Sequence, residues 1–146
     1  MKIAFYKGKG KLFNRLIRWY TKSQYSHAEL IIRDLGNGYY RGGSSSAMEG
    51  GVRMKAIKFS SENWTIVDVP FGNTVDSYHW YCDNGGAKYD WLGVFKQLKF
   101  LNKFIKNPSK KYYCNEAVAE SVGLLDLGTI HPQEFFDFCV QHDKDR

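Results

Sequence analysis

Residues 111–120 read Lys-Tyr-Tyr-Cys-Asn-Glu-Ala-Val-Ala-Glu, and this stretch decides how the rest of the chain is interpreted. Two tyrosines and a cysteine lead directly into residues that form helices well, which predicts Cys114 at or near a helix N-terminus. Unpaired backbone N–H groups and the helix dipole favour negative charge there. The position therefore suits a thiolate, the nucleophilic form of cysteine. The alternative is a buried core cysteine, because free cysteines are among the most buried residues.

A second informative stretch lies far upstream, at residues 25–32, which read Tyr-Ser-His-Ala-Glu-Leu-Ile-Ile. Its alternation predicts a β-strand whose two faces differ. The apolar face would consist of Ala28, Leu30 and Ile32. His27 and Glu29 fall on the other face, where His27 is either exposed without a role or a general base near neutral pH. Cysteine and histidine can be distant in sequence and still meet in the fold.

Together the two stretches resemble the circularly permuted papain-like cysteine hydrolases, the YiiX-like branch of the NlpC-type superfamily. The resemblance rests on the order of Ser26-His27-x-Glu29-Leu30 early and Tyr113-Cys114-Asn115-Glu116 late. Three further segments fit, at residues 16–21, 50–53 and 88–93. The resemblance implies a permuted papain-like fold in which Cys114 is the nucleophile and His27 the base. It also implies a substrate that is a peptide, a peptidoglycan cross-peptide or a lipid.

Members of this family usually carry a third polar residue, often Glu or His, on the strand after the histidine strand. Residues 34–38, Asp-Leu-Gly-Asn-Gly, predict a hairpin between the two strands. If Leu35 pairs with Gly38, Ser46 falls opposite His27, and Ser46 becomes the leading candidate to orient the imidazole. Ser44 shares that face and is the second choice.

Two carboxylates remain as alternatives for the third position. Glu49 has the wrong parity unless the glycines at 42 and 43 insert a bulge. Glu29 lies on the same strand face as His27. A serine holds an imidazole less firmly than a carboxylate does and supplies no charge to stabilise the imidazolium.

Length and composition predict one α+β domain spanning residues 1–146, with helices packed on an antiparallel sheet. Ten Tyr, ten Phe and four Trp argue for a packed core and against disorder. The expected strands are 2–7, the strand of His27, 39–46, 52–59 and 64–69. The expected helices are 11–21, 73–81, 89–104, the Cys114 helix ending near Gly123, and 132–142. With no secretory leader and no long apolar run, we expect a cytoplasmic protein.

The net charge of +6 is concentrated in two clusters, which lie early in the chain and before the Cys114 helix. The first consists of Lys7, Lys9, Lys11, Arg15 and Arg18, and the second of Lys96, Lys99, Lys103, Lys106, Lys110 and Lys111. Such clusters are most often solvated helix faces, but they can also attract nucleic acid or an anionic membrane. The competing interpretation is therefore a non-catalytic binding protein on the same fold, which contacts an anionic partner through these clusters.

Three cysteines give no disulfide framework and no paired metal-ligand spacing. His79, Cys82 and Asp83 would lie on one side of a helix but lack the fourth ligand of a structural zinc site. Cys139 is expected in the core. We therefore expect no metal or other cofactor, and a thiol-dependent hydrolase or acyltransferase that cleaves an amide or ester bond.

Overall fold

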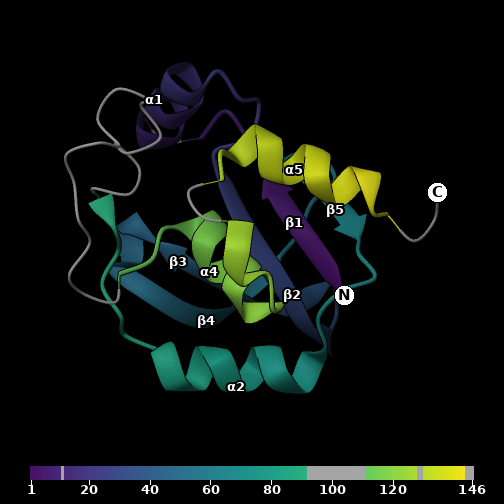
Figure 1. Ribbon diagram of the computed structural model, residues 1–146. Helices are drawn as coiled ribbons and strands as arrows, with labels where there is room; N and C mark the ends of the chain where they lie inside the picture. The colour runs from purple at the N-terminus through teal and green to yellow at the C-terminus, as the bar shows by residue number, and fades with distance from the viewer. Residues whose placement is uncertain (11, 92–110, 128–129, 144–146) are drawn as a thin grey trace.

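The computed structural model describes residues 1–10, 12–91, 111–127 and 130–143, which form a five-stranded antiparallel sheet with helices packed against it (Figure 1). The strands are β1 (Lys2–Tyr6), β2 (His27–Gly36), β3 (Tyr39–Ser46), β4 (Gly51–Lys58) and β5 (Trp64–Asp68). The helices are α1 (Leu12–Thr21), α2 (Thr74–Asn84), α4 (Cys114–Ser121) and α5 (Pro132–Gln141), with short 3₁₀ turns η1 (Ala47–Glu49) and η2 (Leu125–Leu127). The predicted α+β class and antiparallel sheet are confirmed.

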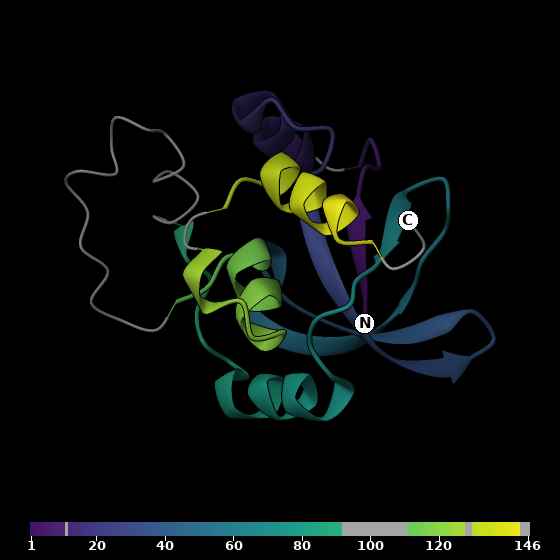
Figure 2. The same cartoon turned by 45° about the vertical axis from the view of Figure 1, so that its right-hand side comes forward.

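The strand order is β4-β3-β2-β1-β5, so β2, which begins with His27, occupies the centre of the sheet. Helix α4 packs on β2 and β3, and α5 contacts β5. Figures 1 and 2 show both helices on the same face of the sheet, with α2 running across its end below α4. The face that β2 turns toward these helices carries Ala28, Leu30 and Ile32, all buried as the alternation predicts.

The main core lies between this sheet face and the helices. Ile3 and Phe5 of β1, together with the apolar face of β2, meet Val118 of α4 and Phe135 of α5. The rings of Phe5 and Phe135 lie 5.7 Å apart in an edge-on arrangement. The core therefore fixes α4, and with it Cys114, relative to the central strand.

The hairpin between β2 and β3 forms one residue later than the sequence predicts. Gly36 pairs with Tyr39, and the two-residue turn at Asn37 and Gly38 takes the positive φ angles of 54° and 76° that these residue types tolerate. Two irregularities farther along β2 then shift the pairing, so that Leu30 lies opposite Gly43. The pairing near His27 is therefore the one that the sequence predicts, because the two irregularities compensate for the shifted turn.

The predicted helix at 89–104 is wrong at its start, because Tyr89 and Asp90 are not helical; Trp91 is helical as predicted, and residues 92–104 lie outside the described ranges. Tyr89 instead forms a parallel bridge with Tyr112, beside the beginning of α4. The backbone of Asp90 donates to the carbonyl of Tyr112 and the backbone of Tyr112 donates to the carbonyl of Lys88. The hydrogen bonds to a neighbouring segment replace those of a helical turn.

Candidate functional site

His27 and Glu29 lie side by side on the face of β2 that points away from the core. Two residues along a strand return to the same face, and the alternation therefore places both side chains in one row. The Nε2 atom of His27 lies 2.6 Å from Oε1 of Glu29. The imidazole keeps 19% of its surface exposed, whereas the glutamate side chain keeps 1%. Glu29 is thus a buried carboxylate that faces an accessible imidazole.

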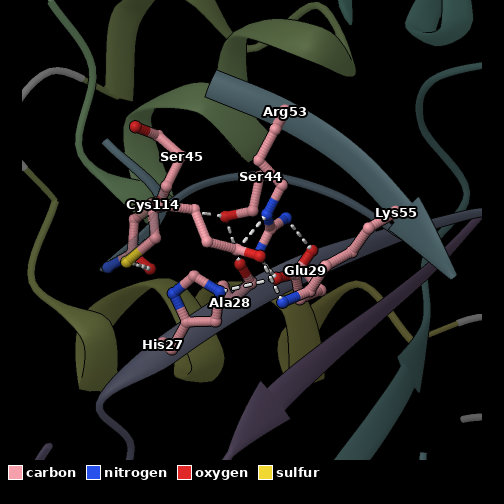
Figure 3. A network of polar contacts seen from close by, with 10 residues as sticks. His27, Ala28, Glu29, Ser44, Ser45, Arg53, Lys55 and Cys114 are labelled. Atoms are coloured by element: carbon pink, nitrogen blue, oxygen red, sulfur yellow. Dashed lines mark hydrogen bonds and ion pairs between the residues drawn. The ribbon is translucent and has the colours of Figure 1, made fainter. Parts of the chain in front are cut away.

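Cys114 is the first residue of α4, after Tyr113, whose extended backbone precedes the helix. The residue is only 5% exposed, and its sulfur lies beside the imidazole of His27, where it helps to raise the pKa of the ring (Figure 3). Because Nε2 of His27 faces Glu29, the other ring nitrogen, Nδ1, faces the sulfur (Figure 3). The Cys114 Sγ also lies 3.6 Å from Oδ1 of Asn115. Cysteine, imidazole and carboxylate therefore form a continuous line.

The segment that leads into α4 is tied to the sheet by β3. Ser45 donates from Oγ to the carbonyl of Tyr112 at 2.6 Å, and Ser44 donates to the carbonyl of Ala28 at 2.6 Å. Both serines are fully buried. Two adjacent serines of β3 thus hold the two parts of the site: Ser45 binds the segment before Cys114, and Ser44 binds the strand of His27. These bonds help to fix the sulfur relative to the imidazole.

The interactions among Cys114, His27 and Glu29 favour the charged forms of His27 and Glu29. Burial by itself would lower the pKa of His27, but the negative charge of Glu29 and the contacts with Cys114 outweigh it and raise the pKa to about 9. Burial alone would raise the pKa of Glu29, but the cations His27 and Arg53 lower it. The imidazole is therefore expected to be protonated, and Glu29 ionised, near neutral pH.

Arg53 of β4 completes the pairing of Glu29 from two strands away. Its Nη1 and Nη2 atoms donate to the two carboxylate oxygens of Glu29, at 2.8 Å and 2.5 Å (Figure 3). Its Nε atom donates to Glu49 at 2.5 Å, and Lys55 donates to the other oxygen of Glu49 at 2.7 Å. The buried carboxylate is thus fully supplied with charged donors.

Small residues on β3 make this contact across two strands possible. Ser44 pairs with Arg53 and Gly42 with Lys55, so the two small side chains lie in the space between β2 and β4. A Cβ atom at Gly42 would lie 3.2 Å from Oε2 of Glu29 and 2.8 Å from Cδ1 of Ile57. Glycine at this position leaves room for the Glu29 carboxylate.

A cavity of about 390 Å³ opens over this same sheet face. Its polar wall contains the His27–Glu29 pair and the Arg53 group. Its remaining wall comes from α1, η1, β5 and the segment after α2, and includes Asn14, Ile17, Ala47, Met48, Trp64 and Tyr89. Tyr89, Tyr113 and Cys114 also pack against one another in a small cluster with Ala47. The histidine thus faces a space large enough for part of a substrate.

Ser46, the leading candidate for the third position, lies on this cavity with His27. Continuing the register from Leu30 and Gly43 places it opposite His27, as the sequence predicts. The group that lies within hydrogen-bond distance of the imidazole, however, is the Glu29 carboxylate. Ser44 instead donates to the Ala28 carbonyl, and Glu49 contacts Arg53 and Lys55. Of the four candidates, Glu29 has the geometry to orient the ring.

Arg53 is the residue that the sequence interpretation did not single out as part of the site. Its position could have been found only from two strand pairings: the β2–β3 register that brings Ser46 opposite His27 also brings Ser44 opposite Glu29, and the separate β3–β4 register brings Arg53 opposite Ser44. The pattern is recognisable: Arg53 is a long cationic side chain opposite a small residue, and it lies on the same sheet face as the buried Glu29, two strands away.

The remaining cysteines differ from Cys114 in their surroundings. Cys139 is fully buried in α5, as expected, and burial raises its pKa to about 12, which makes it inert near neutral pH. Cys82 is exposed on α2. In the described ranges, no three His, Cys, Asp or Glu side chains are grouped so that they could hold a metal ion.

Of the two basic clusters, the second falls on residues outside the described ranges apart from Lys111. Four members of the first cluster line a groove beside α1, namely Lys7, Lys9, Arg15 and Arg18. None of the helices described is both long enough and apolar enough to span a bilayer. Comparisons with protein-family models and with curated proteins find no match for the chain.

Proposed function

We propose that this protein is a thiol-dependent hydrolase or acyltransferase with a permuted papain-like fold, which cleaves an amide or ester bond through Cys114 and His27. The observation that carries the proposal is the contact between these two side chains, which come from segments 87 residues apart in numbering and meet beside a cavity. Glu29 is the third member. The resemblance of the two sequence stretches to the permuted papain-like hydrolases supports the same conclusion.

The reaction requires the proton shared by Cys114 and His27 to lie on Nδ1 of His27, which the raised pKa of the imidazole favours near neutral pH. Glu29 accepts from Nε2–H, which leaves Nδ1 as the basic nitrogen of the neutral ring and stabilises the imidazolium once it forms. The thiolate then attacks the carbonyl carbon of the substrate. The negative charge moves to the carbonyl oxygen of a tetrahedral intermediate.

That oxygen is stabilised by the start of α4. The backbone N–H of Cys114 belongs to the first turn of an eight-residue helix and has no acceptor within the helix. It lies beside the attacking sulfur and can donate to the developing oxyanion. When the intermediate collapses, the C–N or C–O bond breaks and the leaving group takes the proton from His27.

The acyl group now forms a thioester with Cys114. In a second half-reaction, His27 removes a proton from water or from another acceptor, which attacks the thioester carbonyl. The C–S bond breaks, the acyl group leaves with the acceptor, and the sulfur recovers the proton from His27. Water gives hydrolysis and an alcohol or amine gives acyl transfer, because the same base serves both acceptors.

The proposal is tested by alkylating the intact protein with iodoacetamide across pH and following each cysteine by mass spectrometry. Exposed Cys82 is a control within the same chain. Cys114 should react faster than Cys82 at about pH 6.5, because only an activated thiol is a thiolate there. His27→Ala should remove this difference, and both His27→Ala and Cys114→Ser should lower hydrolysis of an activated aryl ester by about 10²-fold or more.

The proposal fails if Cys114 reacts no faster than in the denatured protein at any pH. It also fails if His27→Ala keeps near-normal ester turnover. A non-catalytic binding protein that holds the same side chains would show no acyl-enzyme, and its partner would bind equally well after Cys114 is blocked.

A further inference from the structure

Helix α1 exposes a row of large apolar side chains. Leu12 is 80% exposed, Leu16 is 58% exposed and Trp19 is 78% exposed. Their spacing of four and three residues places them on one side of the helix. Isolated apolar side chains are normal at a protein surface, but three large ones in a row on a single helix are the signature of a contact surface. We call these three residues the α1 stripe.

The other side of α1 already has a partner within the protein. Ile17 is buried, and both Ile17 and Asn14 line the cavity that contains His27. The α1 stripe is therefore not the side that holds the helix in place. The helix has one apolar side for the cavity and a second apolar side that faces solvent.

Cations lie next to the α1 stripe. A groove lined by Lys7, Lys9, Arg15 and Arg18 also includes Trp19, so the tryptophan belongs to both surfaces. Arg18 is held in place by a 2.9 Å hydrogen bond from Nη1 to the carbonyl of Lys7. Glu62 is the acidic residue on the same groove. Four positive charges against one negative charge give this side of the molecule an affinity for anions.

Leucine and tryptophan in one row with arginine and lysine beside them fit an anionic lipid surface. An interfacial helix buries its apolar side chains at the level of the lipid headgroups and pairs its cations with lipid phosphates. Tryptophan favours this boundary because its ring is apolar and its N–H is polar. Nucleic acid would satisfy the cations but would leave the leucines without a partner.

We propose that α1 docks this protein on the surface of an anionic membrane, with the α1 stripe inserted among the lipids and Lys7, Lys9, Arg15 and Arg18 against the headgroups. The docking depends only on α1 and the neighbouring groove and does not require the thiol chemistry. Because the opposite side of α1 lines the cavity, docking would hold the cavity close to the lipid surface.

The experiment is flotation of the full chain with vesicles of phosphatidylcholine alone and with vesicles of equal parts phosphatidylcholine and phosphatidylglycerol. The protein should partition to the anionic vesicles at least about tenfold better, and about 0.5 M salt should weaken this preference. Leu16→Gln/Trp19→Gln should reduce partitioning by about tenfold or more, because the two side chains lose their transfer into the lipid. Leu125→Gln is the matched control, since Leu125 is 75% exposed elsewhere.

For the cations, Lys9→Gln/Arg15→Gln should also reduce partitioning by about tenfold. Arg33→Gln/Arg41→Gln removes the same charge from exposed positions of β2 and β3 and should leave it unchanged. The proposal is overturned if the α1 variants bind as their controls do, if neutral vesicles bind equally well, or if the chain binds RNA and not vesicles. Cys114→Ser should float like the wild type, which separates the docking from catalysis.

Discussion

The Nε2 atom of His27 lies 2.6 Å from Oε1 of Glu29, two residues farther along the same strand face. The pair is therefore formed within one short segment and needs no loop to bring it together. The strand fixes the direction of the carboxylate, and Arg53 holds the carboxylate from the other side. The imidazole is left with one nitrogen for the sulfur, as the proposed reaction requires.

Glu29→Gln should lower turnover by about 10²-fold or more while the fold is kept. An amide at this position can donate to Nε2, which favours the tautomer with the proton on Nδ1, and that tautomer cannot accept a proton from Cys114. The loss of the Glu29 charge should also lower the pKa of His27 from its value of about 9. Ester turnover and the NMR titration of the imidazole measure the two effects. Glu62→Gln is the control, because Glu62 lines the groove beside α1 and not the cavity, and equal turnover of both variants would exclude Glu29 as the orienting group.

Ser46→Ala should keep turnover within about threefold of the wild type, because the hydrogen bond that orients His27 comes from Glu29. Ser46 lines the cavity and is nearly buried, so the variant also reports whether its hydroxyl contacts the substrate. Steady-state kinetics separate the cases: an effect on KM alone indicates substrate binding. A fall in kcat as large as that of Glu29→Gln would restore Ser46 to the third position.

Much of this arrangement could be predicted from local sequence. Helix-forming residues after Cys114 predict its place at the start of α4, and the alternation after His27 predicts which side of β2 faces the apolar core. Both are short-range signals. The hairpin at Asn37 and Gly38 is another, since few other residue types tolerate its positive φ angles.

The choice among Glu29, Ser44, Ser46 and Glu49 could not be made from sequence, because it depends on side-chain reach and not on register. The register that the sequence predicts places Ser46 opposite His27 correctly, yet the longer Glu29 side chain reaches the ring from the same strand. Its burial as an ion is tolerated because Arg53 comes from β4, which is a long-range contact. A propensity or a period along one segment carries no information about such a partner.

Arg53→Gln should lower the free energy of unfolding by about 3 kcal/mol. Glu29 is 1% exposed, and removal of its bidentate partner leaves a buried charge with only the imidazole beside it. Lys55→Gln is the matched control, because Lys55 also pairs with a glutamate but is 44% exposed, and exposed ion pairs contribute less than about 1 kcal/mol. Urea denaturation of both variants measures the difference. Equal losses would mean that Arg53 contributes no more than a surface ion pair.

The raised pKa of His27 also predicts how stability depends on pH, provided that the sulfur is first removed. In the wild type, the Cys114 sulfur lies beside the imidazole and also helps to raise its pKa, so a change of stability with pH would report on the two groups together and not on His27 alone. Cys114→Ser removes the second titrating group and exposes the contribution of His27.

In the Cys114→Ser background, the native state should bind the His27 proton more tightly than the unfolded chain, because the Glu29 charge still raises the imidazole pKa above 6.5. The stabilisation is complete below pH 6.5 and is lost as the pH rises through the folded-state pKa of His27, which in this variant lies below the wild-type value of about 9 because the contribution of Cys114 is gone. Within this window the free energy of unfolding should fall by up to about 1.4 kcal/mol per pH unit. Urea denaturation at several pH values measures the slope, which should disappear in Cys114→Ser/His27→Gln and in Cys114→Ser/Glu29→Gln. A slope that persists without His27 would come from another group and would contradict the assignment of the raised pKa to the His27–Glu29 pair.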